Sequence, residues 1–420
     1  MQSRDERQEE ARIKWIKNKC KGSIEACTGF GKTRVAINCL KSIINKYPTK
    51  KFLVIVPTIT LKDQWVQQLD LTGLSLNGEV MVINSAIKNL YKTDILVIDE
   101  CHRAAAETLI QVFEKIDYKY ILGLTATFER LDNRHELLEK YCPVIDRITT
   151  EEALLNGWIA NYKEYQILID VDDIDSYKEY NKRFTEHFEF FNFEFDTVMS
   201  LVGKDGFRNR LKLRDQMCRG RYVSEEERKN ILKSITYHSA EFIRAIQARK
   251  SFINNHPKKI EIARRIIEAR PNAKIITFSN NIKMAESIGY GFVYTGKDSK
   301  KKSRITLEEF SQCKSGVINS VSKLNEGADV KDLSVAIILG LDSSETKSVQ
   351  RRGRTVRKEN NKIAEIFNIV INQTVESKWY ETSHKSSSYI TIDENGLNDV
   401  LAGKEPKPYI KKIKDFQFRF

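Results

Sequence analysis

The segment Ala26-Cys27-Thr28-Gly29-Phe30-Gly31-Lys32-Thr33 decides how the first part of this sequence folds. It follows a strand-like stretch and opens a segment, residues 35–44, whose apolar residues recur at helical spacing. Gly29 and Gly31 let the backbone turn its N–H groups inward, and a helix that starts here adds the positive end of its dipole. This strand–loop–helix context predicts a phosphate-binding loop, although Ala26 stands where the general pattern has glycine.

The residue types in this loop predict a site for a nucleoside triphosphate. Lys32 would reach the β- and γ-phosphates, and the Thr33 hydroxyl would ligate Mg²⁺. We therefore expect ATP and Mg²⁺ as cofactors. The predicted ATP-binding residues of the loop are Thr28, Gly29, Phe30, Gly31, Lys32 and Thr33.

An acidic pair, Asp99 and Glu100, follows the apolar run 95–98. The C-terminal end of a parallel strand beside a phosphate-binding loop is where the metal belongs. We expect Asp99 to hold Mg²⁺ and Glu100 to orient and deprotonate the attacking water. Taken alone, the pair is also compatible with two solvated acids at a strand-end turn.

A basic cluster far downstream, residues 350–357, supplies the positive charge that phosphoryl transfer needs in the transition state. Taken alone, this cluster is typical of a basic helix start. Beside a phosphate-binding loop, Arg354 and Arg357 become candidate catalytic arginines that act together with Lys32 and Glu100.

Alternation of short apolar runs with helical patterns predicts the fold class. Strand-like runs occur at 52–56, 95–98, 120–124, 274–278, 316–318, 335–340 and 366–371. Between the two groups of runs, aromatic residues recur at helical spacing from Tyr177 to Phe195. We interpret this stripe as the core of a helical insertion, with a base-stacking platform as the alternative.

The predicted fold is α/β, with two tandem parallel-sheet lobes and a helical insertion between them or in the second lobe. The predicted divisions are lobe 1 at 1–150, a join into lobe 2 at 151–174, the helical insertion at 175–255, lobe 2 at 256–376 and a C-terminal extension at 377–420.

The charge balance suggests a polyanionic partner. The chain has 70 Lys and Arg against 57 Asp and Glu, a net charge of +13, which fits nucleic acid binding or a general solubility charge. Residues 208–221 hold six basic side chains and one acidic one, so this stretch either contacts phosphates or forms a solvated face. The candidate phosphate contacts are Arg208, Arg210, Lys212 and Arg214.

Several protein classes are excluded by composition. The apolar runs are far shorter than the roughly 18 residues that a membrane-spanning helix needs. Residues 1–10 are charged and polar, unlike a secretory signal. The seven cysteines form no CxxC pair and no histidine lies at zinc-finger spacing, which argues against structural zinc. Their odd number and wide spacing are typical of reduced thiols, so we expect a cytoplasmic protein.

Taken in order, these motifs resemble those of the superfamily 2 helicases of the DExH type. Gln8 resembles the adenine-reading glutamine that precedes motif I. The other correspondences are motif I at 26–33, Ia at 56–58, II at 99–102, III at 125–127, IV at 277–279, V at 324–330 and VI at 350–357. The resemblance covers nearly the whole chain.

The resemblance implies two RecA-like lobes with ATP in the cleft between them, so that hydrolysis requires lobe closure. It also implies roles for residues that local chemistry does not identify. Gln8, Gly327 and Asp329 would lie near ATP, and His102, Thr125, Thr127 and Gln350 would couple the ATP state to lobe position. The residues that would contact the nucleic-acid backbone are Thr58, Ser279 and Ser85, the last as the candidate for motif Ib.

Within the family, the chain looks most like the XPB-like and phage UvsW-like proteins. That likeness implies a DNA helicase or translocase of a phage or bacterium that acts on branched or forked duplexes in replication, repair or recombination. We expect it to act as a monomer. Phe128 departs from the family, which usually has proline there. With seven residues before Gln8, we expect no N-terminal accessory domain. An RNA helicase, an ATP-switched nucleic-acid clamp and the motor of a restriction system are the alternatives.

Overall fold

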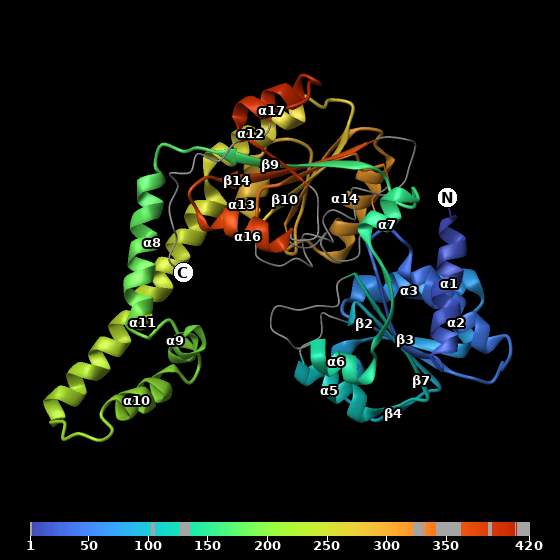
Figure 1. Cartoon of the computed structure of the whole chain (residues 1–420), viewed down its shortest axis with the longest axis horizontal. Coiled ribbons are helices and arrows are strands. Elements are labelled where there is room, and N and C mark those ends of the chain that lie inside the picture. Colours follow the sequence, from blue (N-terminus) through green and yellow to red (C-terminus); the bar gives the residue numbers. More distant parts are fainter. Residues whose placement is uncertain are drawn as a thin grey trace.

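The computed structural model describes residues 2–101, 106–126, 135–321, 330, 332–341, 363–384, 389–407 and 409. These residues form two lobes, each built on a sheet, and a helical arm that projects from the second lobe (Figure 1). All strand pairings within them are parallel. The predicted fold class, two parallel-sheet α/β lobes with a helical insertion, is confirmed.

The first lobe contains a six-stranded sheet with the order β3-β2-β5-β7-β1-β8. Its strands are β1 (Lys21–Ala26), β2 (Phe52–Val56), β3 (Gly78–Val82), β5 (Ile95–Asp99), β7 (Tyr120–Thr125) and β8 (Val144–Ile148). Its helices are α1 (Arg4–Lys17), α2 (Lys32–Ile44), α3 (Ile59–Thr72), α4 (Ile83–Ala86), α5 (Ala106–Lys115), α6 (His135–Tyr141) and α7 (Thr150–Leu155), with a short 3₁₀ helix at Ser75–Asn77. Two short strands, β4 (Tyr91–Lys92) and β6 (Ile116–Asp117), pair apart from the main sheet.

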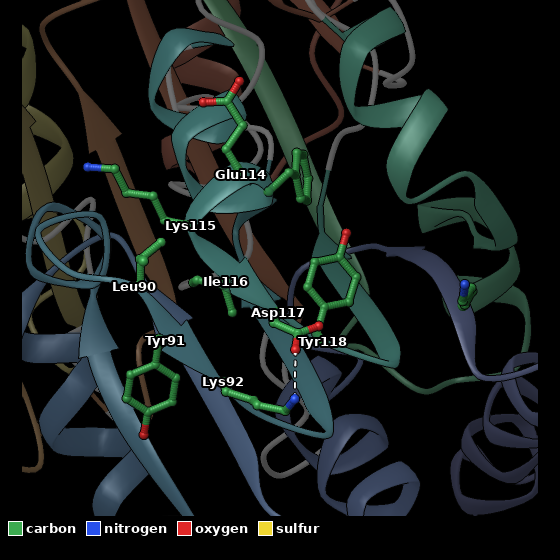
Figure 2. Close-up of a pocket in the computed structure, with 10 residues that line it drawn as sticks. Leu90, Tyr91, Lys92, Glu114, Lys115, Ile116, Asp117 and Tyr118 are labelled. Carbon is green, nitrogen blue, oxygen red and sulfur yellow. Dashed lines mark ion pairs between the residues drawn. The ribbon is translucent and has the colours of Figure 1, made fainter.

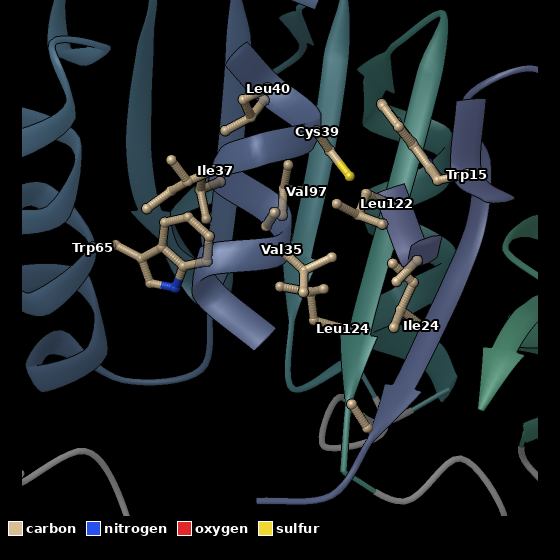
Figure 3. Close-up of a cluster of buried hydrophobic side chains, with 14 of the residues drawn as sticks. Trp15, Ile24, Val35, Ile37, Cys39, Leu40, Trp65, Val97, Leu122 and Leu124 are labelled. Atoms are coloured by element: carbon tan, nitrogen blue, oxygen red, sulfur yellow. The ribbon is translucent and has the colours of Figure 1, made fainter. Parts of the chain in front are cut away.

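Both faces of this sheet are buried, which explains why its strands are continuous apolar runs. Along β5, Val97 faces one hydrophobic cluster while Leu96 and Ile98 face another. Successive side chains of a strand point to opposite faces, so both must be apolar when helices cover both sides. Figure 3 shows Val35 and Leu40 of α2 packed over the Val97 face.

The chain crosses to the second lobe only after residue 160. Ala153, Trp158 and Ile159 belong to the core of the first lobe, and the Trp158 ring centroid lies 5.5 Å from that of Phe30. The next strand, β9 (Tyr162–Ile169), already pairs along its whole length with β14 (Ala364–Ile371) of the second sheet.

The second lobe contains a seven-stranded sheet with the order β11-β12-β10-β13-β14-β9-β15. Its remaining strands are β10 (Lys274–Ser279), β11 (Phe292–Tyr294), β12 (Gly316–Val321), β13 (Val335–Ile338) and β15 (Ile390–Ile392). Its helices are α12 (Pro257–Glu268), α13 (Ile282–Ser287), α14 (Lys300–Gln312), α16 (Val375–Ser383) and α17 (Glu394–Leu401). Because β9 comes before the arm and α12 comes after it, the arm interrupts the second lobe.

The arm consists of α8 (Ile174–Glu189), α9 (Phe195–Val202), α10 (Gly206–Met217) and α11 (Glu225–Asn255). Phe184 and Phe188 pack against Phe242 of α11, which confirms the interpretation of these aromatic residues as core. The prediction of one continuous helical stripe is wrong beyond Glu189, where α8 ends in a turn. Phe195 instead starts α9 and is 51% exposed.

None of the helices in the described part of the chain has the length and apolar character needed to cross a bilayer. All seven cysteines are free thiols; Cys313 is half-buried and the other six are buried.

Candidate active site

The phosphate-binding loop has the backbone shape that its sequence predicts. Gly29 and Gly31 have φ values of 86° and 99°, in the left-handed region that favours glycine. A Cβ at Gly31 would lie 2.7 Å from Nε2 of Gln8, so a larger residue there would displace the Gln8 amide and also strain the backbone. Gly31 is the N-cap residue of α2 and makes no side-chain cap, which leaves the first N–H groups of the helix available to an anion.

Lys32 and Thr33, the first two residues of α2, are both half-buried beside this loop. The Lys32 ammonium donates a hydrogen bond to the carbonyl of Ala26 at 3.2 Å. That carbonyl ends β1, so the ammonium already lies at the edge of the sheet where a phosphate would enter.

Asp99 and Glu100 lie at the same edge of the sheet. β5 ends at Asp99 and β1 ends at Ala26, and β7 pairs with both strands between them. Oδ2 of Asp99 accepts a hydrogen bond from Nε1 of Trp65 at 2.7 Å, and Oδ1 accepts one from the backbone N–H of Glu100 at 3.0 Å. Glu100 has φ = 49°, an uncommon value for a residue with a side chain, and such strain concentrates at functional sites.

The environment of Asp99 fits a bound cation. Burial and then the nearby charge of Glu100 raise the pKa of Asp99 to about 6, although Trp65 and Lys32 act in the opposite direction. A divalent cation would remove the cost of this buried charge. A carboxylate and a hydroxyl such as that of Thr33 are ligands that suit Mg²⁺, so the residues present fit the predicted metal.

Gln8 of α1, the predicted adenine-reading residue, lies against the phosphate-binding loop. Its side chain is buried, and Nε2 donates to the carbonyl of Phe30 at 2.7 Å. Its Oε1 is buried and has no hydrogen-bond partner. An orphaned buried acceptor is costly, so this oxygen suits the exocyclic amine of a nucleotide base.

A buried ion-pair network holds α1 in this place, and motif spacing did not identify it. Arg7 binds both carboxylate oxygens of Asp146, at 2.6 and 2.9 Å, and Nε of Arg7 binds Glu152 at 2.7 Å. Lys14 contacts Asp146 at 2.5 Å. The network ties α1 to β8 and α7, and its partners are more than a hundred residues apart in the sequence, where no local pattern can link them.

The predicted nucleic-acid contacts of motifs Ia, Ib and IV have different surroundings. Oγ1 of Thr58 caps α3 by accepting from the N–H of Leu61 at 3.3 Å, and Ser85 is exposed on α4. Ser279 is only 1% exposed and its hydroxyl has no partner. Ser279 is thus buried at the end of β10 in this arrangement, and its contact with nucleic acid stays a prediction.

The basic stretch of the arm divides into two pairs on α10. Arg208 and Lys212, four residues apart, are both exposed. Arg210 donates to the carbonyl of Leu201 at 3.0 Å, and Arg214 forms an ion pair with Asp215 at 2.6 Å. Half of the predicted phosphate contacts are therefore engaged within the protein.

Several predicted site residues lie outside the described residues, and their roles stay predictions. Thr125 is described; it is buried at the end of β7. The residues outside the description are His102, Thr127, Gly327, Asp329, Gln350, Arg354 and Arg357.

A surface cavity of about 750 Å³ on the first lobe is separate from this site. Figure 2 shows Tyr91 and Lys92 of β4 facing Ile116 and Asp117 of β6, with an ion pair of 3.1 Å between Lys92 and Asp117. Lys21, which also lines the cavity, starts β1, whereas the phosphate-binding loop follows the end of that strand. The cavity therefore lies at the opposite edge of the sheet from the nucleotide site.

Comparisons with known proteins agree with this geometry. The sequence profile described as type III restriction enzyme, res subunit, matches residues 3–88 and 79–130, and the one described as helicase conserved C-terminal domain matches residues 258–359. The DNA 3'-5' translocase XPB2 of Sulfurisphaera tokodaii is 30% identical over 393 residues, covering 88% of this chain and 82% of that protein. The putative ATP-dependent RNA helicase QP509L of African swine fever virus is 28% identical over 164 residues, covering 33% of this chain and 31% of its own length.

Solved structures show the same fold. The helicase domain of Pyrococcus furiosus Hef has a TM-score of 0.53 and 17% identity, covering 90% of this chain and 97% of that one. S. cerevisiae Dbp5 bound to RNA and ADP BeF3 has a TM-score of 0.59 and 12% identity, and the match covers 94% of this chain and 91% of that one. With the phosphate-binding loop, the acidic pair and an XPB2 relative along most of its length, the chain belongs to the ATP-hydrolysing helicases of superfamily 2, in the XPB-like group.

Proposed function

We propose that this chain is an ATP- and Mg²⁺-dependent DNA translocase that unwinds or remodels branched or forked duplexes. Hydrolysis would be coupled to closure of the two lobes. The observation that supports the proposal is the half-site on the first lobe: Lys32 and Thr33 open α2 just after β1, and Asp99 and Glu100 lie at the end of β5, at the same edge of the sheet.

The half-site residues would divide the chemistry among them. The Lys32 ammonium would exchange the Ala26 carbonyl for the β- and γ-phosphates. Thr33 and Asp99 would hold Mg²⁺, which when bound neutralises charge on the phosphate oxygens. Glu100 would accept the proton of the attacking water, and Trp65 would keep the Asp99 carboxylate oriented through its N–H.

The half-site is incomplete without positive charge from the second lobe. We assign that charge to Arg354 and Arg357, following the motif VI resemblance. An arginine that reaches the γ-phosphate only on closure makes hydrolysis depend on lobe position. By the same resemblance, Gly327 and Asp329 would border the nucleotide, and His102, Thr125, Thr127 and Gln350 would transmit its state.

The relatives favour DNA over RNA as the substrate, because the relative named for DNA matches this chain along more of its own length than those named for RNA. The relative named as a DNA translocase matches along 82% of its own length, whereas the viral proteins named as putative RNA helicases match along 31% of theirs. Because those viral proteins also match this chain, an RNA helicase remains the second candidate.

The arm would add contacts to the nucleic-acid backbone. Arg208 and Lys212 project together from α10, and Phe207 beside them is 63% exposed. Cations that contact phosphates give affinity without sequence preference, as a translocase requires. The engaged pair Arg210 and Arg214 would instead support the shape of the arm.

We also infer action as a monomer in the cytosol of a bacterium or a phage-infected cell. The free thiols support a reducing compartment.

Strand displacement on fork, flap and four-way-junction DNA, with and without ATP, tests the proposal. We expect ATP-dependent displacement, with Glu100→Gln as the inactive control. ATPase stimulation by single-stranded DNA, duplex DNA and RNA in competition separates the DNA enzyme from the RNA enzyme. One turnover per binding event without displacement would identify a clamp and would refute the translocase.

A further inference from the structure

The base of the arm is joined directly to the second lobe. α11 runs without interruption from Glu225 to Asn255, and a single residue, His256, separates it from α12 (Figure 1). Nδ1 of His256 accepts from the N–H of Lys258 at 3.2 Å, and Nε2 contacts Oδ1 of Asp173 at 2.9 Å. Asp173 is the N-cap residue of α8, so the entry and the exit of the arm are held together.

A buried tyrosine anchors this base to the lobe. Tyr177 of α8 is fully buried, and its hydroxyl accepts from the N–H of Val375, the first residue of α16, at 3.0 Å. The Tyr177 ring lies 5.6 Å from the ring of Phe252 on α11. Both long helices of the arm are therefore fixed at one place.

Asparagine side chains connect the base to the loop that follows β10. Oδ1 of Asn254 accepts from Nδ2 of Asn280 at 2.8 Å. Nδ2 of Asn281 donates to Oδ1 of Asn255 at 2.9 Å and to the carbonyl of Asn254 at 3.3 Å. Asn280 and Asn281 directly follow Ser279, the end of β10 and of the predicted motif IV.

Asn280 also contacts the neighbouring strand. A Cβ built on Gly340 would lie 2.3 Å from the Asn280 amide, so the amide packs on that glycine. Leu339 and Gly340 directly follow β13, and the backbone N–H groups of both donate to the carbonyl of Phe278. This is the C-terminal edge of a parallel sheet, the edge at which ligands of such folds bind. In the sequence, motif V follows β12 and motif VI follows β13.

We propose that Asn254 is a positioning residue that links the arm, through Asn280, to the C-terminal edge of the sheet in the second lobe. Nucleic acid held by the arm would then bias the arrangement of the edge that completes the ATP site. This inference rests on the proposed function for its DNA-dependent part. The link itself is a property of the second lobe and the arm alone.

A double-mutant cycle of Asn254→Ala, Asn280→Ala and the pair tests the link. Basal ATPase activity should stay unchanged, while the ratio of DNA-stimulated to basal kcat falls by about two- to tenfold, the range that one ordinary hydrogen bond supports. The double variant should lose no more than either single variant. Asn230→Ala, an exposed asparagine near the start of the same helix, is the matched control and should behave like the wild type.

The polarity of the bond gives a sharper test than truncation. Asn254→Asp keeps the acceptor and should retain the stimulation ratio. Asn280→Asp places an acceptor against an acceptor and should lose at least as much as the alanine variant. A purely structural role predicts equal loss of thermal stability with an unchanged ratio in every variant, and that result would overturn the proposal.

A measurement without DNA or ATP separates this inference from the proposed function. Spin labels at the exposed positions Lys204 and Lys314, in a Cys313→Ser background, report the distance from the arm to the second lobe. We expect one narrow distribution that broadens in the Asn254→Ala/Asn280→Ala variant. An unchanged width would overturn the link, whereas a wild-type enzyme that DNA fails to stimulate would refute the proposed function alone.

Discussion

Replacing Arg7 by alanine should lower both the stability of the first lobe and its affinity for nucleotide. The Arg7 and Asp146 side chains are 6% and 2% exposed, and they form two parallel hydrogen bonds of 2.6 and 2.9 Å. Removing one partner of a buried pair costs about 3–5 kcal/mol. Lys14 stays 2.5 Å from Asp146 and is itself 48% exposed, so it can still neutralise part of the charge. We therefore expect the free energy of unfolding to fall by about 2–4 kcal/mol at neutral pH.

The loss should depend on pH in a defined direction. Burial alone would raise the pKa of Asp146, but the hydrogen bonds from Arg7 and Lys14 outweigh it and lower the pKa below its ordinary value. A lowered folded-state pKa contributes stability above the unfolded-state pKa, about 3.9 for aspartate, and this stability is lost as the pH falls through the folded-state value. The difference between wild type and Arg7→Ala should therefore be full at neutral pH and shrink in acid.

Urea unfolding followed by tryptophan fluorescence measures this effect, because Trp15, Trp65 and Trp158 all lie in the core of the first lobe. Arg12→Ala, on the same helix, is the matched control. Its ion pair with Glu9 is partly exposed and should contribute less than about 1 kcal/mol.

The Arg7 variant should also bind nucleotide more weakly, because Gln8 follows Arg7 on α1 and contacts the loop at Phe30. A stability loss no larger than that of Arg12→Ala would refute the reasoning that this buried pair holds α1.

The remaining predictions concern catalysis and DNA binding. Lys32→Ala should abolish ATPase activity with little change in thermal stability, and substantial DNA-stimulated turnover would contradict the loop assignment. Glu100→Gln should bind ATP yet turn over about 10²- to 10⁴-fold more slowly in a steady-state assay; a loss below about tenfold would exclude it as the base. Arg354→Ala should retain ATP affinity and lose about 10³-fold or more in kcat, whereas a matching loss of affinity would indicate ground-state binding. Arg208→Ala with Lys212→Ala should reduce the salt dependence of duplex affinity by about one to two units of slope, measured by titration at several salt concentrations, and a solvated face would leave the slope unaltered.

The features that depend on neighbouring residues in the sequence, such as single strands and the phosphate-binding loop, could be predicted from the sequence. The strand β2 (Phe52–Val56) coincides with the predicted run, and β5 and β7 differ from the predicted runs by one residue at their ends. The shape of the phosphate-binding loop follows from glycines two residues apart and the helix that begins after them. Such features depend on residues within one or two turns of chain, where spacing and residue type carry the information.

The sequence by itself therefore determined the α/β class, the phosphate-binding loop and the acidic pair, because each is a contiguous pattern. Tertiary structure alone decided that Arg7 binds Asp146, that Trp65 orients Asp99 and that Asn254 meets Asn280. It also decided that Ser279 is buried. These facts follow from which strands become neighbours and where the arm interrupts the second lobe. Strand order and packing are set by burial of the whole chain, and no local spacing encodes which distant residues that burial brings together.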